Sequence, residues 1–211
     1  MAGPGIALQS DGKILVNGFA LSRYDSNGNL DTSFGIFGIA STPSGVAGLA
    51  LQSNGSIVAA GSLLTLASPT GPQLTEFAVL RYTTSGVPDV TFGSGGGAIA
   101  RPASGSTNSA AAVAIQSNGS IVAADQTGLL GPGFTTSNNR FDVARFTSAG
   151  QLDATFGTND QVSTSFGGSV ESPSAVVIQP DGKILVVGSS AKIVSGTTSA
   201  GRFALARYLA Q

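Results

Sequence analysis

One segment of eleven residues recurs four times along this chain, and this repetition limits the possible folds more than any other feature. The glutamine at its fourth position recurs at intervals of 43, 64 and 63 residues, at Gln9, Gln52, Gln116 and Gln179. A self-similar period of this size is typical of propellers and other repeat arrays. We therefore predict an all-β, single-domain β-propeller with units at about 5–44, 45–108, 109–172 and 173–211. The alternative is a partial propeller that a second chain completes.

The recurring segment reads as a β-hairpin. Each copy holds an apolar run, then Asp-Gly or Asn-Gly, then a second apolar run such as Lys13–Val16 or Ser120–Ala124. These dipeptides tolerate the positive φ angles that tight hairpin turns require. The second run is apolar at successive positions, which suits a strand packed on both faces. The pattern thus predicts up-and-down antiparallel blades.

A second motif follows each hairpin. A third strand carries an arginine in every copy, at Arg23, Arg81, Arg145 and Arg207. A glycine turn, an aspartate and Ser/Thr-Phe-Gly come next, and we expect this Phe-Gly segment to form the fourth strand. The three complete copies are Asp31–Gly35, Asp89–Gly93 and Asp153–Gly157, while the fourth copy stops before its aspartate.

These motifs resemble the delta-60 repeat family of bacteria. Asp181–Leu185, Phe203–Tyr208 and Leu30–Gly35 match its pattern almost residue for residue, and the resemblance covers nearly the whole chain. It implies a β-propeller in a secreted or cell-surface protein. It implies no catalytic residues, because the family has none established.

Composition excludes several classes of function. Charged residues make up 10% of the chain and the net charge is -1, so no basic surface for nucleic acid is expected. No apolar run is long enough to insert into a membrane. The chain has no histidine and no cysteine, which removes the commonest catalytic base and metal ligands. We expect no enzyme activity and no cofactor, and a location outside the cell, although Met1–Gly5 shows no signal peptide.

The connections between second and third strands vary in length, so we expect long loops at 63–75, 126–139 and 191–201. In the first unit a tight turn at Asn17-Gly18 replaces the loop. Loops held by a rigid scaffold often bind ligands, although such loops also drift freely. The candidate ligand or partner residues on them are Gln73, Glu76, Phe134, Asn138, Asn139, Arg140, Lys192 and Arg202.

The repeated arginines and aspartates favour a structural role. Each arginine precedes an aspartate by eight residues in the pairs Arg23 and Asp31, Arg81 and Asp89, and Arg145 and Asp153. A catalytic pair would not be needed three times, whereas a scaffold contact repeats with its unit. A weaker hypothesis is a calcium site in the first unit, formed by the alternate oxygen ligands Asp25, Asn27, Asn29 and Asp31.

Two functions remain open from the sequence. The first is a non-enzymatic structural or interaction protein of the bacterial surface, self-assembling into a homo-oligomer or filament through an unpaired edge strand. The residues of that edge are Phe203, Leu205 and Tyr208. A longer protein that supplies the missing strand explains the same edge equally well, since Met1–Pro4 is too short to supply it. The second function is recognition of a surface glycan or protein by the variable loops.

Overall fold

The computed structural model describes residues 5–18, 20–42, 45–66, 73–100, 106–130, 136–158, 160–194, 197–198 and 201–209. All regular elements in these ranges are strands. The first blade contains β1 (Ile6–Leu8), β2 (Ile14–Asn17), β3 (Leu21–Tyr24) and β4 (Ile39–Ala40). The second contains β5 (Val46–Leu51), β6 (Ile57–Leu66), β7 (Gln73–Tyr82) and β8 (Gly97–Ala100).

The third blade contains β9 (Ser106–Ile115), β10 (Ile121–Leu130), β11 (Thr136–Phe146) and β12 (Gln161–Thr164). The fourth contains β13 (Val170–Ile178), β14 (Ile184–Ala191) and β17 (Arg202–Tyr208), and a small separate hairpin holds β15 (Ile193–Val194) and β16 (Thr197–Thr198). No helix in the described ranges could cross a membrane.

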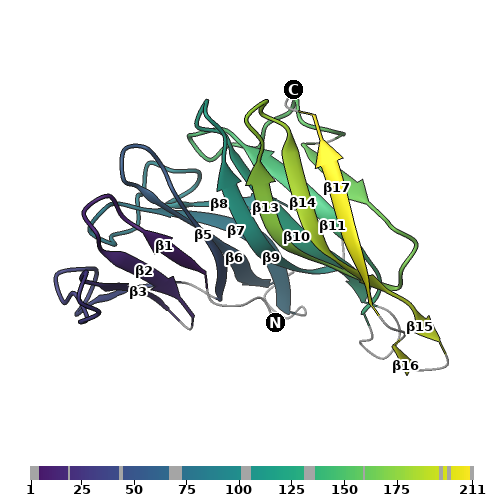
Figure 1. Ribbon diagram of the computed structural model, residues 1–211, viewed down its shortest axis with the longest axis horizontal. Helices are drawn as coiled ribbons and strands as arrows, with labels where there is room; N and C mark the ends of the chain where they lie inside the picture. The colour runs from purple at the N-terminus through teal and green to yellow at the C-terminus, as the bar shows by residue number, and fades with distance from the viewer. Residues whose placement is uncertain are drawn as a thin grey trace.

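Neighbouring strands of each blade pair in chain order and antiparallel, which makes up-and-down sheets of four, four, four and three strands. Figure 1 shows these sheets stacked along the long axis, with the first blade in purple at one end and β17 in yellow at the other. The predicted all-β propeller is therefore confirmed, in the form of an open, partial propeller of four blades.

The hairpin turns form as their sequences predict. Gly12, Gly55, Gly119 and Gly182 have φ angles of 84°, 83°, 86° and 80°, which favour glycine. The Asp or Asn before each glycine accepts a hydrogen bond from a backbone N–H two residues later. For example, Asn118 Oδ1 accepts from Ser120 N at 2.9 Å. This local bond holds the turn in the same shape in all four blades.

The structure corrects the expected fourth strand. Phe34-Gly35 and its counterparts lie in a turn, and the fourth strand comes afterwards, at β4, β8 and β12. Gly35 has φ +56°, and a Cβ at this position would lie 2.1 Å from the carbonyl oxygen of Ile39. The Phe-Gly turn therefore folds too tightly for a strand, and only glycine fits its last position.

Two of the expected loops are also wrong. Residues 63–66 and 73–75 extend β6 and β7, and Leu63 pairs with Glu76 within that ladder. Residues 126–130 and 136–139 extend β10 and β11 in the same way. Long hairpins therefore replace most of these loops because the backbone continues to pair beyond the repeat pattern. The approximate unit boundaries at residues 109 and 173 lie within β9 and β13.

The hydrophobic core lies between the blades, in three clusters with one at each contact between neighbouring blades. Leu15 and Leu21 of the first blade pack against Ile57 and Ala59 of the second, and all four are 0% exposed. Corresponding clusters join the second blade to the third and the third to the fourth. Each inner blade therefore has an apolar layer on both faces, as a stacked array requires.

Candidate functional site

The first two blades meet at an arginine whose planar side chain spans both. Arg23 of β3 donates from Nε to Asp31 Oδ2 at 2.9 Å, within its own blade. Its Nη1 donates to the carbonyl oxygen of Thr84 in the second blade at 2.6 Å. The guanidinium also lies 4.6 Å from the centre of the Phe34 ring, in a cation–π contact. One side chain thus fixes its own Phe-Gly turn and binds the next blade.

A glycine in the next blade completes this contact. The Gly35 N–H donates to the carbonyl of Ser85 at 2.7 Å. Gly86, two residues after Thr84, lies directly on the Phe34 ring, so that a Cβ there would be 2.7 Å from a ring carbon. We call residues 25–29, 83–87 and 147–151 the acceptor turns. A joint is the contact of one blade's arginine and Phe-Gly turn with the acceptor turn of the next blade.

The same joint connects the second and third blades. Arg81 Nη1 donates to the carbonyl of Ser148 at 2.7 Å, and the Gly93 N–H donates to the carbonyl of Ala149 at 2.8 Å. A Cβ on Gly150 would lie 2.9 Å from the Phe92 ring. In the third blade, Arg145 pairs with Asp153 at 2.8 Å and stacks on Phe156 at 4.8 Å. The bonds to the next blade assign Arg23 and Arg81 to joints, and each of the three Arg–Asp pairs lies within its own blade.

The aspartates of the joints are held ionised. The hydroxyl of Thr91 donates to Asp89 at 2.6 Å, and this bond is the main cause that lowers the pKa of Asp89 below 3.8. The Thr155 hydroxyl lowers the pKa of Asp153 in the same way. In the first blade the pKa of Asp31 is lowered mainly by the hydrogen bond from the Ser33 hydroxyl, and next by Lys13. An acid already bonded to several donors is poorly suited to exchanging protons with a substrate.

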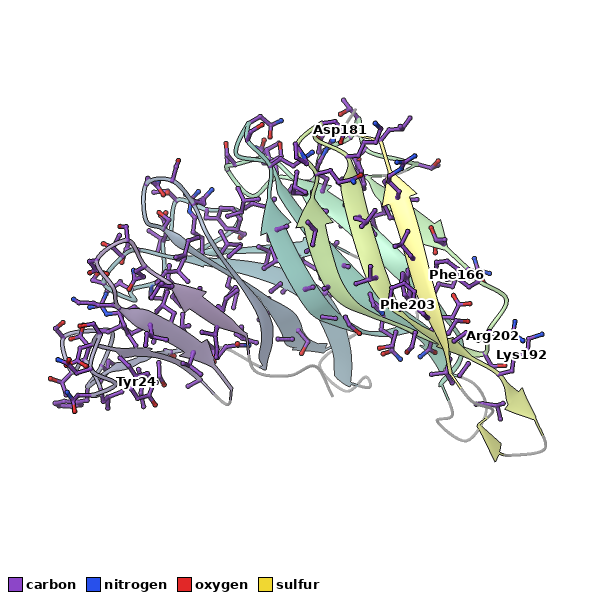
Figure 2. All side chains as sticks on the ribbon, in the orientation of Figure 1. Tyr24, Phe166, Asp181, Lys192, Arg202 and Phe203 are labelled. Atoms are coloured by element: carbon purple, nitrogen blue, oxygen red, sulfur yellow. The ribbon has the colours of Figure 1, made fainter. Side chains whose placement is uncertain are left out.

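The fourth blade exposes an apolar face, and the equivalent face is buried in the blades before it. Phe203 is 76% exposed and Leu205 47%, whereas their counterparts Phe77 and Val79 are both 0% exposed. We call this the C-terminal face; its residues are Val177, Leu185, Val187, Phe203, Leu205 and Arg207. Figure 2 shows Phe203 on this last blade. The strand β17 pairs with β14 alone among the described strands.

The first blade has a corresponding apolar face at the other end of the array. Ile6 is 67% exposed and Leu8 69%, whereas Val113, the counterpart of Ile6 in the third blade, is 8% exposed. We call this the N-terminal face; its residues are Ile6, Leu8, Ile14, Val16 and Tyr24. Tyr24 lies at the opposite end of Figure 2 from Phe203. The array therefore ends in two exposed surfaces of the kind that it buries internally.

The expectation that Tyr208 belongs to the exposed edge is wrong. Its hydroxyl lies 2.8 Å from Thr164 Oγ1 of the third blade, and its ring packs against the core between these blades. Burial raises the pKa of Tyr208 above 10.0. Since successive side chains alternate between the faces of a strand, Phe203 and Leu205 share one face and Tyr208 lies on the other.

The candidate loop residues whose side chains the structure describes lie in different environments. Glu76 and Asn139 are 7% and 2% exposed, because the ladders of β7 and β11 carry them into the interior, so neither lies on an open rim. Arg140 is exposed on β11. Of the others, Gln73 begins β7, Asn138 lies within β11, and Phe134 lies outside the described residues.

Two of the candidates, Lys192 and Arg202, are brought together. They line a cavity of about 410 Å³ at the end of the fourth blade, where the turn at Phe166–Gly168 forms the opposite wall. Both basic side chains are exposed. Figure 2 shows Phe166, Lys192 and Arg202 at this end of the molecule. The cavity therefore offers two positive charges beside one aromatic ring.

A buried carboxylate that the sequence analysis missed shapes this cavity. Glu171 is 0% exposed, and its Oε1 accepts the backbone N–H groups of Phe166 at 2.7 Å and Gly168 at 2.9 Å. The Phe166 ring stacks edge-on against Phe141 at 5.1 Å. The sequence does mark this turn, because Ser165-Phe166-Gly167 is an additional copy of the Ser-Phe-Gly motif at a place that does not fit the repeat spacing.

The calcium hypothesis for the first acceptor turn is not supported by the geometry. Asp25 Oδ1 accepts the N–H groups of Asn27 at 2.9 Å and Asn29 at 2.8 Å. Asp31 is bonded to Arg23 and also lies 3.1 Å from Lys13 Nζ. Cations and turn N–H groups thus use the carboxylates that calcium would need. Among the described residues no group of three or more acidic side chains could hold a metal ion.

The comparisons with known proteins agree with this geometry. A family described as a domain of unknown function (DUF5122) beta-propeller matches residues 9–34, 52–92, 133–156 and 179–211. These ranges cover more than half of the chain and include the repeated arginines at 23, 81, 145 and 207. Among curated proteins no relative was found.

Solved structures share the fold at low sequence identity. A protein of unknown function from Dyadobacter fermentans is 13% identical with a TM-score of 0.55, over 95% of this chain and 59% of its own. A polysaccharide lyase, an ulvan lyase solved with a bound saccharide, is 11% identical with a TM-score of 0.58, over 97% of this chain and 55% of its own. The chain thus spans between half and two thirds of these propellers, which are larger.

Proposed function

Because the chain belongs to the DUF5122 beta-propeller family, we propose that it is a non-enzymatic structural and interaction protein that associates with further blades. The observation that carries this proposal is the C-terminal face. Its Phe203 and Leu205 are 76% and 47% exposed at positions where the inner blades are fully buried. An apolar face next to an open strand edge is a favourable site for another sheet.

The edge of β17 supports the same proposal. Within the described residues β17 has one hydrogen-bonded neighbour, so the other side of its backbone faces away from the sheet. A strand added from another chain satisfies such groups and extends the blade. The resemblance to delta-60 repeat proteins supports a place for this assembly outside the bacterial cell or on its surface.

The joints support a role without catalysis. The three aspartates Asp31, Asp89 and Asp153 are bonded to arginines of their own blades. The full sequence supplies no histidine and no cysteine as an alternative base or nucleophile. The most regular charged groups of the chain are therefore already engaged in ion pairs within their blades.

Light scattering coupled to size-exclusion chromatography tests the proposal. We expect the mass of the 211-residue chain to rise with concentration, and a Phe203→Ser, Leu205→Ser double variant to stay monomeric. Val90→Ser is the matched control, because Val90 is 71% exposed but lies in the second blade, away from the C-terminal face. A chain that remains monomeric at every concentration contradicts the proposal.

The cavity at the end of the fourth blade favours a second candidate function, which is binding of an acidic glycan. Lys192 and Arg202 supply positive charge for a carboxylate or sulfate group, and Phe166 supplies a flat apolar contact for a sugar ring. A glycan array comparing the unmodified chain with a Lys192→Ala, Arg202→Ala double variant tests this. Lys183→Ala is the control, since Lys183 pairs with Asp181 on a hairpin turn. If the double variant and the unmodified chain bind the glycans equally well, the cavity is not the binding site.

A further inference from the structure

We infer that the N-terminal face receives the C-terminal face of a second copy of this chain, so that copies join head to tail. This inference deepens the proposed function and rests on it. Within one chain, each blade already presents a C-terminal face to the N-terminal face of the following blade. The two exposed faces are therefore the two halves of an interface that the chain forms three times.

The apolar residues on both faces agree with this arrangement. In the contact between the second and third blades, Phe77 and Val79 pack against Ile121 and Phe146, and all four are 0% exposed. In the fourth blade the positions of Phe77 and Val79 hold Phe203 and Leu205. In the first blade the positions of Ile121 and Phe146 hold Ile14 and Tyr24. Large apolar side chains thus stand on both sides of the contact between copies.

The first acceptor turn is formed and open. The Asp25 N–H donates to the carbonyl of Asn29 at 2.8 Å, as the Thr83 N–H does to the carbonyl of Val87 at 2.9 Å. Gly28 has φ +85°, close to the +82° of Gly86. However, nothing lies within 4 Å of a Cβ placed on Gly28, whereas Gly86 covers the Phe34 ring. The turn has the shape of an acceptor without a preceding blade against it.

The fourth blade offers an arginine for this turn. Arg207 occupies the position of Arg23 and Arg81 on the third strand of its blade, and it is exposed. By the geometry of the internal joints, its guanidinium reaches the carbonyl of Ser26, which corresponds to Thr84 and Ser148. The described part of the fourth blade contributes the arginine to this contact, so we expect the contact to be smaller than an internal joint and reversible.

A head-to-tail contact uses two different surfaces, so it leaves one free surface of each kind after every step. Two copies that close on each other place eight blades in one ring, which is within the usual range of propellers. If the rotation does not close, the same contact gives a longer row of copies. Either result follows from the same pair of faces.

Mixing two single-face variants tests the inference. Leu8→Asp disables the N-terminal face and Leu205→Asp disables the C-terminal face, and both positions are exposed, so the fold tolerates the change. We expect each variant alone to be monomeric by light scattering. An equimolar mixture should form a heterodimer and nothing larger, because each variant keeps one intact face. Val90→Asp, in the second blade, should associate like the unmodified chain.

The outcomes separate this inference from the proposed function. If Leu8→Asp associates as well as the unmodified chain, the N-terminal face is not used and the inference is wrong, while assembly through β17 stands. If the unmodified chain never associates, the proposed self-assembly fails as well. With an affinity tag on one variant, a pull-down from the mixture shows whether the dimer contains one chain of each variant.

The arginine provides a second measurement. Arg207→Ala should weaken association by about tenfold, because one charged hydrogen bond is worth roughly 1.4 kcal/mol or more. Arg207→Lys should recover little of this, since lysine lacks the planar fork. Unfolding of the dilute monomer should be unchanged in both variants, which shows that the loss is in the contact. Unchanged association in Arg207→Ala overturns the assigned role of this residue.

Discussion

Arg81 of the second blade donates a hydrogen bond from Nη1 to the carbonyl oxygen of Ser148 in the third, at 2.7 Å across 67 residues of sequence. Arg23 makes the equivalent bond to Thr84. Together with the backbone bonds of Gly35 and Gly93 to the next blade, these bonds add polar contacts to the apolar packing between blades. In both cases the arginine comes from the preceding blade and the acceptor carbonyl from the following one, so the two sides of the contact can be changed separately by mutation.

Replacing Arg81 should weaken the array. Arg81→Ala removes the bonds to Asp89 and to the Ser148 carbonyl, and it leaves the Asp89 carboxylate without its cation. We expect the free energy of unfolding in urea to fall by about 2 kcal/mol. Arg81→Lys should recover less than half, because lysine cannot bond both partners in one plane. Arg140→Ala, at an exposed position, should change the free energy by less than about 0.5 kcal/mol.

Two glycines with the same backbone shape separate turn strain from the joint itself. Gly28→Ala places a Cβ at φ +85° in open space, so we expect a loss of about 1 kcal/mol. Gly86→Ala adds the same strain at φ +82° and forces the new methyl group into the Phe34 ring. Its loss should be greater by roughly 1–3 kcal/mol. If urea unfolding shows the same loss of free energy for both variants, the Phe34 ring moves away from the new methyl group without cost.

The hydroxyl beside Asp89 should control the acid stability of its joint. Because the folded-state pKa of Asp89 is lowered from 3.8, its contribution to stability is full above that value. The contribution is lost as pH falls through the lowered pKa. In Thr91→Val the main cause of the shift is absent, so the pKa of Asp89 should rise in a carboxyl NMR titration. Asp153, held by Thr155, is the control within the same molecule and should not change.

Glu171 should hold the wall of the cavity in the fourth blade. Glu171→Ala removes the acceptor for the N–H groups of Phe166 and Gly168 and leaves a void in a fully buried position. We expect the free energy of unfolding to fall by about 2–4 kcal/mol. Glu171→Gln keeps one acceptor oxygen and should lose less. Hydrogen exchange at Phe166 and Gly168 should become faster in the alanine variant, and unchanged rates would contradict this role.

The sequence predicts the fold well where local chemistry determines it. Asp-Gly and Asn-Gly require the turns at Gly12, Gly55, Gly119 and Gly182, and they appear there. Strand alternation also separates Tyr208 from Phe203 and Leu205, so the sequence alone already places Tyr208 on the opposite face of β17. The Phe-Gly segment resembles a strand in sequence, and its turn becomes evident only from the close approach of the Ile39 carbonyl to Gly35.

The candidate site could be predicted only in part. The sequence predicts Lys192 and Arg202 from their place between strands, but the part of the cavity wall at Phe166 comes from the connection between β12 and β13. Glu76 and Asn139 are polar and were expected on exposed loops. Their burial depends on ladders that extend beyond the repeat, which tertiary pairing decides and composition does not.

The direction of the joint has a consequence for how such chains change over evolution. In the second repeat the acceptor turn contacts the blade before it, while the arginine and Phe-Gly turn contact the blade after it. A duplicated repeat therefore arrives with one half of each joint that it needs. We therefore expect that a gene of this kind can gain or lose a whole blade, and that the new neighbours meet matching halves of a joint without a compensating mutation.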